Sequence, residues 1–252
     1  MTVETLPTTH VEARWFYVLM AYACALIAFV GFAPTYWLPV ASGSFTGSPV
    51  IHLHGLLFSA WTLFFIAQTT LAATRHIDRH RALGLFGVAL ATAMLFAGIV
   101  AQIHSIRIGA AAGLELENRT FSIVPITIIV FFACAVGAGI ANVRRPDVHK
   151  RLMLVATISL LPPAIARLVA LAAGLPIGPG HPPPIVFSLV PSFASDLLLV
   201  PALLHDWRMR GRPHRVYLIA GAALLALQVI RVPLGSTPAW HAVTDWLLAF
   251  AA

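Results

Sequence analysis

Long apolar stretches alternate with short polar ones along the whole chain. The stretch 52–84 shows the pattern most fully: no charged residue occurs from Gly55 to Thr74, and the basic segment 75–81 follows at once. At about 1.5 Å rise per residue, a helix of this length covers the roughly 30 Å hydrocarbon core of a bilayer. The stretch is therefore predicted to form a transmembrane helix.

Seven stretches of this kind occur, and they predict an all-α integral membrane bundle that forms one transmembrane domain over residues 1–252. The predicted spans are 15–33, 52–74, 81–106, 121–143, 150–173, 185–205 and 215–233. The tail 236–252 is too short for a further span, and we expect it to form an amphipathic helix at the membrane interface.

Basic residues gather in three of the turns between the predicted spans. Residues 75–81, 144–151 and 208–215 together hold 11 of the 16 lysines and arginines. Because cytoplasmic loops carry an excess of these residues, all three turns are expected in the cytoplasm. The amino terminus is then cytoplasmic and the carboxyl terminus external. The first apolar run lacks a clear small-residue cleavage site, which favours an uncleaved helix over a signal peptide.

Composition argues against several classes of protein. Hydrophobic residues make up 59% of the chain and charged residues 10%, whereas soluble domains carry about a quarter charged residues. The formal charge of +7 comes from short turns rather than one extended patch, so no nucleic-acid partner is expected and the lipid bilayer is the expected partner. The only lysine, Lys150, lies in a turn, which argues against a retinal Schiff base.

Strongly polar residues recur within the spans. They are costly at membrane depth, so we expect them to face the bundle interior and to mark a functional site. Helical angles place them in two tiers. The cytoplasmic tier comprises Gln68, His80, His149 and His214; the external tier comprises His54, Gln102, Arg167, Asp196, Gln228 and Arg231.

For the cytoplasmic tier, two interpretations stand. His80 and His149 begin different helices on the same side, so they could ligate haem b or a transition metal. Alternatively, these histidines lie at the lipid headgroup level without any ligand, as amphipathic side chains often do. No His-x-x-x-His spacing occurs within any of the predicted spans, which favours the second interpretation.

The external tier also has two interpretations. Arg167 and Arg231 could bind an anion or a haem propionate, beside His54, with Asp196 orienting the guanidinium groups. Alternatively, Asp196 neutralises an arginine so that the bundle can insert into the membrane. Pro191 and Pro201 are expected to bend the sixth span.

The turns also carry a resemblance. With His54, Trp61 and Gln68, the segments HRALG (80–84), HKRLM (149–153) and DWRMRGRPH (206–214) resemble families of uncharacterised bacterial multi-pass membrane proteins with such motifs at cytoplasmic helix starts. The chain is similar, more distantly, to small membrane proteins implicated in assembling terminal oxidases. The resemblance implies a bundle of about seven helices in the bacterial inner membrane, with a respiratory complex or another membrane subunit as partner.

Three functions remain open from the sequence. The first is haem or metal binding through intramembrane histidines for respiratory redox or cofactor handling. The second is a small-solute or ion carrier that uses Asp196, Arg167 and Arg231. The third is a structural subunit or assembly factor without a ligand.

Overall fold

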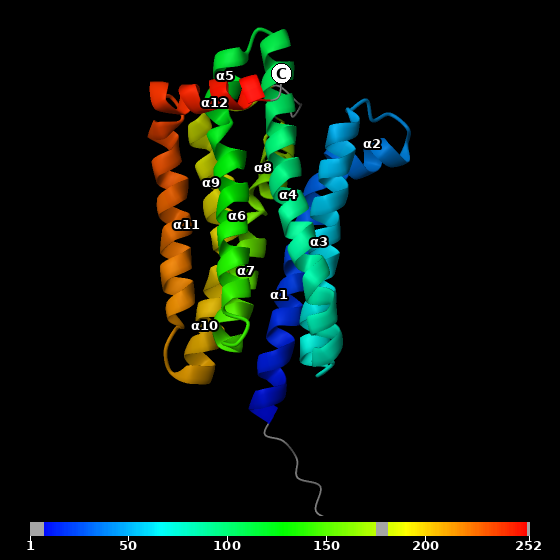
Figure 1. The fold of residues 1–252 in the computed structure, drawn as a ribbon, viewed down its shortest axis with the longest axis vertical. Helices are drawn as coiled ribbons and strands as arrows, with labels where there is room; N and C mark the ends of the chain where they lie inside the picture. Colours follow the sequence, from blue (N-terminus) through cyan, green and yellow to red (C-terminus); the bar gives the residue numbers. More distant parts are fainter. Residues whose placement is uncertain (1–7, 175–180, 251–252) are drawn as a thin grey trace, which may run out of the picture.

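The computed structural model describes residues 8–174 and 181–250, and in this part of the chain every regular element is helical (Figure 1). The elements are α1 (Thr8–Phe32), η1 (Ala33–Trp37), α2 (Leu38–Ala41), α3 (Pro49–Ala73), α4 (Ile77–Ala111), α5 (Glu115–Phe121), α6 (Ile123–Ala141), α7 (Pro146–Ser159), α8 (Pro162–Ala172), η2 (Ile185–Ser188), α9 (Leu189–Asp196), α10 (Leu199–Arg210), α11 (Arg215–Leu234) and α12 (Pro238–Phe250).

Seven helical segments within these described residues are long and apolar enough to cross a membrane. They are Arg14–Ala41, Pro49–Ala73, Ile77–Ala111, Glu115–Ala141, Pro146–Ala172, Ile185–Arg210 and Arg215–Leu234. The predicted all-α bundle of seven candidate spans is therefore confirmed, and the chain is a multi-pass membrane protein.

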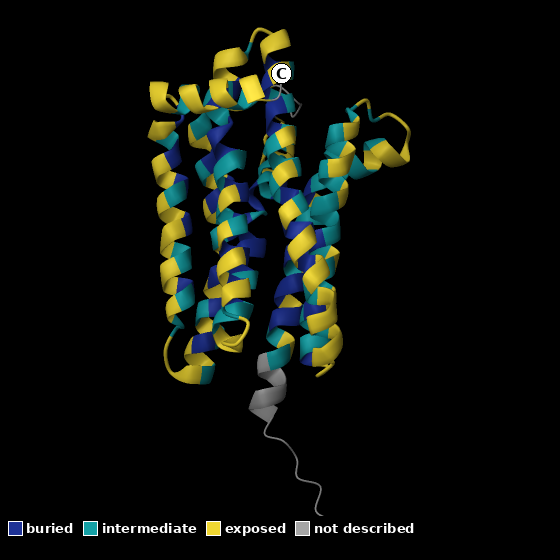
Figure 2. Ribbon diagram, viewed as in Figure 1, coloured by how far each residue is buried: buried dark blue, intermediate teal, exposed yellow. Residues whose placement is uncertain are grey.

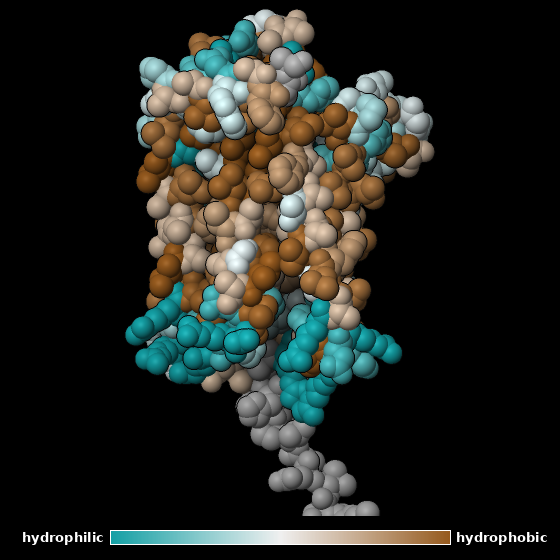
Figure 3. Space-filling view, viewed as in Figure 1, coloured by the Kyte–Doolittle hydropathy of each residue, from teal (hydrophilic) through white to brown (hydrophobic). Residues whose placement is uncertain are grey.

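The two ends of the bundle differ in chemistry. The turns that contain Arg75, Arg144 and Arg212 lie at one end, which we call the basic end. At the other end α12 lies across the ends of the upright helices beside α5, and we call this the α12 end (Figure 1). Between them the surface is an apolar band (Figure 3).

Many large apolar residues of the spans are exposed, and Figure 2 marks exposed residues along the whole length of the upright helices. Leu85 and Ile219 are 79% and 70% exposed. In water such a surface would be unstable, whereas lipid covers it without cost. The interior, by contrast, is built from close helix contacts. At Gly31 of α1, an added Cβ would lie 2.5 Å from the carbonyl oxygen of Ala164 in α8.

Two spans are broken by proline. The fifth span divides into α7 and α8 at residues 160–161, immediately before Pro162 and Pro163. The sixth divides into α9 and α10 at residues 197–198, three residues before Pro201. Each proline lacks the N–H that would bond to the carbonyl four residues earlier, so the helical hydrogen bonding is interrupted there, while residues 160–161 and 197–198 keep right-handed helical backbone angles. Pro191, in contrast, lies within α9.

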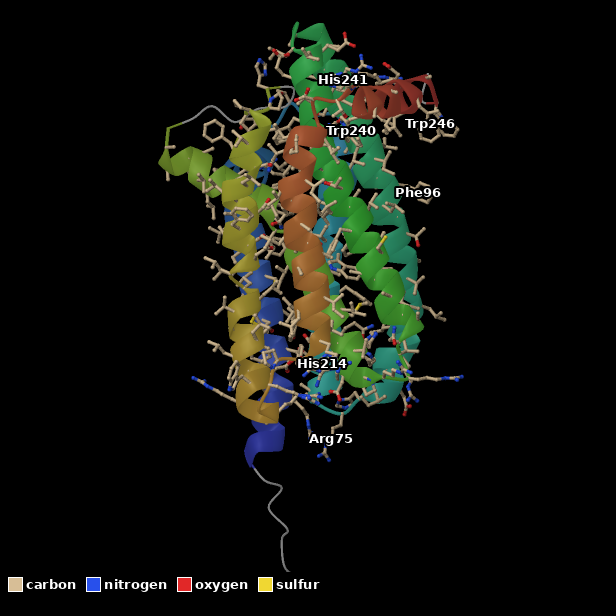
Figure 4. All side chains as sticks on the ribbon, turned by 90° about the vertical axis from the view of Figure 1, so that its left-hand side faces the viewer. Arg75, Phe96, His214, Trp240, His241 and Trp246 are labelled. Atoms are coloured by element: carbon tan, nitrogen blue, oxygen red, sulfur yellow. The ribbon has the colours of Figure 1, made fainter. Side chains whose placement is uncertain are left out.

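Helix α12 is held against α5 by polar contacts. The Arg119 guanidinium forms an ion pair with Asp245, and its Nε donates to Thr244 Oγ1 at 3.0 Å. Trp240 Nε1 donates to the Arg119 carbonyl oxygen at 2.9 Å. Figure 4 shows Trp240, His241 and Trp246 together at this end.

Candidate functional site

His80 and His149 lie side by side at the basic end. His80 is in the first turn of α4 and His149 in the first turn of α7, and their ring centroids are 6.3 Å apart with the ring planes at 88°. Both side chains are half-buried. The two residues that the sequence suggested as a bis-histidine pair are therefore neighbours.

Each ring is fixed by a backbone carbonyl group. His80 Nδ1 lies 3.3 Å from the carbonyl oxygen of Gln68 in α3, and His149 Nδ1 lies 2.9 Å from that of Gly139 in α6. Since a carbonyl oxygen only accepts, Nδ1 must donate in both rings, which places the remaining lone pair of each neutral ring on Nε2.

Gln68 closes this arrangement from α3. Its Nε2 donates to the His80 carbonyl oxygen at 3.2 Å. The side chain of each residue is therefore hydrogen-bonded to the main-chain carbonyl group of the other. Gln68 is buried, and its Oε1 has no hydrogen-bond partner. Four helices, α3, α4, α6 and α7, thus meet at the histidine pair.

His214, the third histidine of the predicted cytoplasmic tier, has a different environment. It precedes α11, and its Nδ1 accepts from the backbone N–H of Val216 at 3.2 Å, which caps the helix. Its own backbone N–H donates to Asp206 Oδ2 at 3.1 Å. Figure 4 shows His214 at the basic end with Arg75.

The largest polar network at the basic end was not anticipated from the sequence. Arg151 and Asp206 form an ion pair, with Nε to Oδ2 at 2.8 Å, and both side chains are buried, 3% and 1% exposed. Arg151 Nη1 also donates to the Asp147 carbonyl oxygen at 2.7 Å. The pair joins α7 to α10 and, through His214, to α11. In the sequence Arg151 ends the basic turn 144–151, and Asp206 lies just before the basic turn 208–215, so the sequence presents both as part of the orientation signal. Asp206, an acid beside the four arginines of that turn, was the available clue.

Two tyrosines extend this network into the bundle. The hydroxyl groups of Tyr17 and Tyr217 are 3.3 Å apart, the Arg151 guanidinium lies 5.8 Å from the centre of the Tyr217 ring, and Lys150 Nζ lies 5.1 Å from that of Tyr17. These are distances at which a cation is attracted to an aromatic face. The network thus joins α1 to α7, α10 and α11.

In the external tier of the sequence analysis, Arg167 lies near α1. Its Nε donates to Thr35 Oγ1 at 3.1 Å, its Nη1 to the Pro163 carbonyl oxygen at 2.8 Å, and its guanidinium lies 4.2 Å from the centre of the Phe32 ring. His54, on α3, has a buried Nδ1 without a hydrogen-bond partner.

Arg231 contacts a different set of residues, between α9 and α11. Its Nη2 donates to Ser192 Oγ at 2.6 Å, and Gln228 Nε2 donates to Asp196 Oδ1 at 3.2 Å. Arg231 and Gln228 are each 1% exposed, and Arg231 Nε and Gln228 Oε1 have no partner. The hydrogen bonds of Asp196 and Arg231 thus lie among η2, α9 and α11, while the partners of Arg167 lie in η1 and α8. Gln102 is buried on α4.

Comparison with protein-family models, with curated proteins and with solved structures found no match. The function of the chain is therefore inferred from its own side chains, and the resemblances named above stay predictions.

Proposed function

We propose that this multi-pass membrane protein binds haem b between His80 and His149, with the basic end in the cytoplasm. One observation carries the proposal: two imidazole rings from different helices lie together, each with Nδ1 bonded to a carbonyl oxygen. Histidines that ligate metals typically donate their other nitrogen to a carbonyl or carboxylate, which fixes the tautomer and the ring orientation.

The separation of the rings suits ligation of one metal atom. With metal-to-nitrogen distances of about 2.0–2.1 Å, two imidazoles on opposite sides of a metal have centroids roughly 6 Å apart. The observed separation of 6.3 Å is close to that value. Both rings can therefore reach one iron atom from α4 and α7 with little movement of the helices.

The donor set favours haem over a bare ion. A tetrahedral ion takes four ligands, and the described residues contain no group of three or more His, Cys, Asp or Glu side chains that could hold a metal. Haem would supply four nitrogen ligands of its own, so His80 and His149 would be the only ligands needed from the chain.

The surrounding charge also suits haem. Arg79 and Arg81 flank His80, and Arg144 and Arg145 precede His149; all four side chains are exposed at the basic end. Arginine binds carboxylates through paired N–H groups, so these side chains can neutralise two propionates. A bis-histidine iron has no open position, which suits electron transfer or haem handling, with a respiratory complex or another membrane subunit of the bacterial inner membrane as partner.

The test is an absorption spectrum of the protein, purified in mild detergent from cells supplied with iron and a haem precursor. We expect a Soret band that shifts and sharpens with α and β bands on dithionite reduction. His80→Ala and His149→Ala should each abolish it, whereas His76→Ala should not, because the His76 side chain is exposed and contacts Thr74 rather than the histidine pair. A folded, colourless protein that also fails to take up added haemin would refute the proposal.

A second candidate, a small-solute or ion carrier, is supported by the two broken helices. Discontinuous spans in transporters often flank a substrate site near the middle of the membrane. Here the break at residues 197–198 follows Asp196, beside Gln228 and Arg231. Under this candidate Asp196→Asn abolishes flux into proteoliposomes, measured with chloride and with protons as probes, and leaves the absorption spectrum unchanged. If neither test gives a signal, a ligand-free structural subunit is favoured.

A further inference from the structure

A cavity of about 370 Å³ lies between α1 and α10 at the basic end, away from the histidine pair. It is lined by Trp15, Phe16, Leu19, His205, Arg208 and Met209. Two of its lining rings, those of Phe16 and His205, stack with centroids 4.0 Å apart and planes at 3°. The cavity thus combines one cation with an apolar wall.

The cation of this cavity is available to a ligand. Within the described residues, the ion pairs at the basic end use Lys150, Arg151 and Arg210 with Asp147 and Asp206. Arg208 takes part in none of them and is exposed. Its guanidinium can therefore bind an anion without breaking a contact of the fold.

The level of the cavity along the bundle indicates what kind of anion fits. The apolar band gives way to hydrophilic residues at the basic end (Figure 3). Trp15, which lines the cavity, is 45% exposed, and Trp207, which precedes Arg208 in the chain, is 61% exposed. Exposed tryptophans are typical of the headgroup level of a membrane. Leu19, 67% exposed, lies one turn further along α1, toward the middle of the span.

We propose that this cavity binds one anionic phospholipid of the leaflet at the basic end. Arg208 holds the phosphate, and Trp15, Leu19 and Met209 pack against the start of an acyl chain. Basic pockets between transmembrane helices at this level are known to suit anionic headgroups. A free phosphate compound would contact only Arg208, whereas a phospholipid would contact both Arg208 and the apolar wall of the cavity.

Native mass spectrometry of the full chain in detergent, titrated with short-chain phosphatidylglycerol, tests the proposal. We expect one lipid to remain bound, more tightly than phosphatidylcholine, and glycerol phosphate not to bind. Arg208→Gln should weaken phosphatidylglycerol binding roughly tenfold, the effect of losing a charge-assisted hydrogen bond. Arg212→Gln, in the same turn but outside the cavity, is the matched control and should leave binding nearly unchanged.

A second variant distinguishes lipid binding in the cavity from general attraction of the lipid to the basic surface. Leu19→Trp fills the apolar half and should reduce binding of both lipids, whereas Arg208→Gln should remove mainly the preference for phosphatidylglycerol. Equal binding of the two lipids by the unaltered protein, or equal effects of Arg208→Gln and Arg212→Gln, would overturn the proposal. Binding of glycerol phosphate as strong as that of the lipid would also overturn it.

Discussion

At the scale of single residues, the basic end holds a buried ion pair next to the candidate haem ligands. Arg151 and Asp206 are nearly inaccessible, and the Asp206 carboxylate also accepts from the backbone N–H of His214. When the partner of a buried charge is removed, the cost of desolvating that charge is no longer offset by the attraction within the ion pair. The pair therefore matters more for stability than the exposed ion pairs around Asp147.

Replacing Asp206 by asparagine should lower the free energy of unfolding by about 3 kcal/mol, because the buried Arg151 charge loses its buried partner and keeps only the ion pair with the exposed Asp147. Thermal unfolding in detergent, followed by circular dichroism, measures the loss. Asp147→Asn is the matched control: its side chain is 56% exposed, and the expected loss is below about 1 kcal/mol. Equal losses in the two variants would contradict the assignment.

His214 should make stability depend on pH. Burial, reinforced by the positive charges of Arg151 and Arg210, lowers the pKa of His214 below its ordinary value of 6.5. The neutral ring caps α11, and protonating it in the folded state costs more than in the unfolded state. This contribution is complete above the unfolded pKa and is lost as pH falls through the lower, folded pKa.

The measurement is the melting temperature between about pH 8 and about pH 5, where histidine changes charge. His214→Asn keeps a capping side chain but does not titrate, so its melting temperature should fall less over this range than that of the unaltered protein. Parallel curves for the two proteins would show that His214 is not the titrating group.

At the scale of elements, close backbone contact decides which helices pack. Gly31 of α1 lies against the Ala164 backbone of α8, and backbone atoms cannot move aside as a flexible side chain can. This contact also holds α8 just beyond the proline break of the fifth span. A side chain at residue 31 must therefore push the two helices apart.

Gly31→Ala should destabilise the protein by about 1–3 kcal/mol, the usual cost of overpacking a tight core. Gly137→Ala provides the comparison, because a Cβ at residue 137 meets nothing within 4 Å. It should be neutral or slightly stabilising, since alanine favours a helix. Unfolding by heat in the same detergent compares the variants, and similar values for both would contradict the close approach of α1 and α8.

The elements themselves could largely be predicted from the sequence, since runs of apolar residues of membrane-spanning length need no knowledge of tertiary contacts. The break in the fifth span could not be placed in this way. Pro162 and Pro163 were visible, but prolines are tolerated in continuous transmembrane helices when neighbouring groups satisfy the backbone. Where the backbone turns depends on the helices packed around it.

At the scale of the whole molecule, helical angles predicted on which face of its helix each polar residue lies. They did not predict which residues of other helices it contacts. His80 and His149, which the sequence predicted to begin helices on one side, form a pair because each lies in the first turn of its helix and α6 packs against both α4 and α7. The external tier came out as two sets of contacts, around Arg167 and around Arg231. Depth alone cannot tell which helices are neighbours.

Electron paramagnetic resonance of the oxidised, haem-loaded protein tests most directly whether both histidines ligate one iron. Two imidazoles with planes at 88° predict a low-spin ferric signal with strong anisotropy, dominated by one large g value. That signal should disappear in His80→Ala and in His149→Ala and persist in His76→Ala. A high-spin signal in the unaltered protein, or a low-spin signal that survives either substitution, would contradict the haem site proposed between α4 and α7.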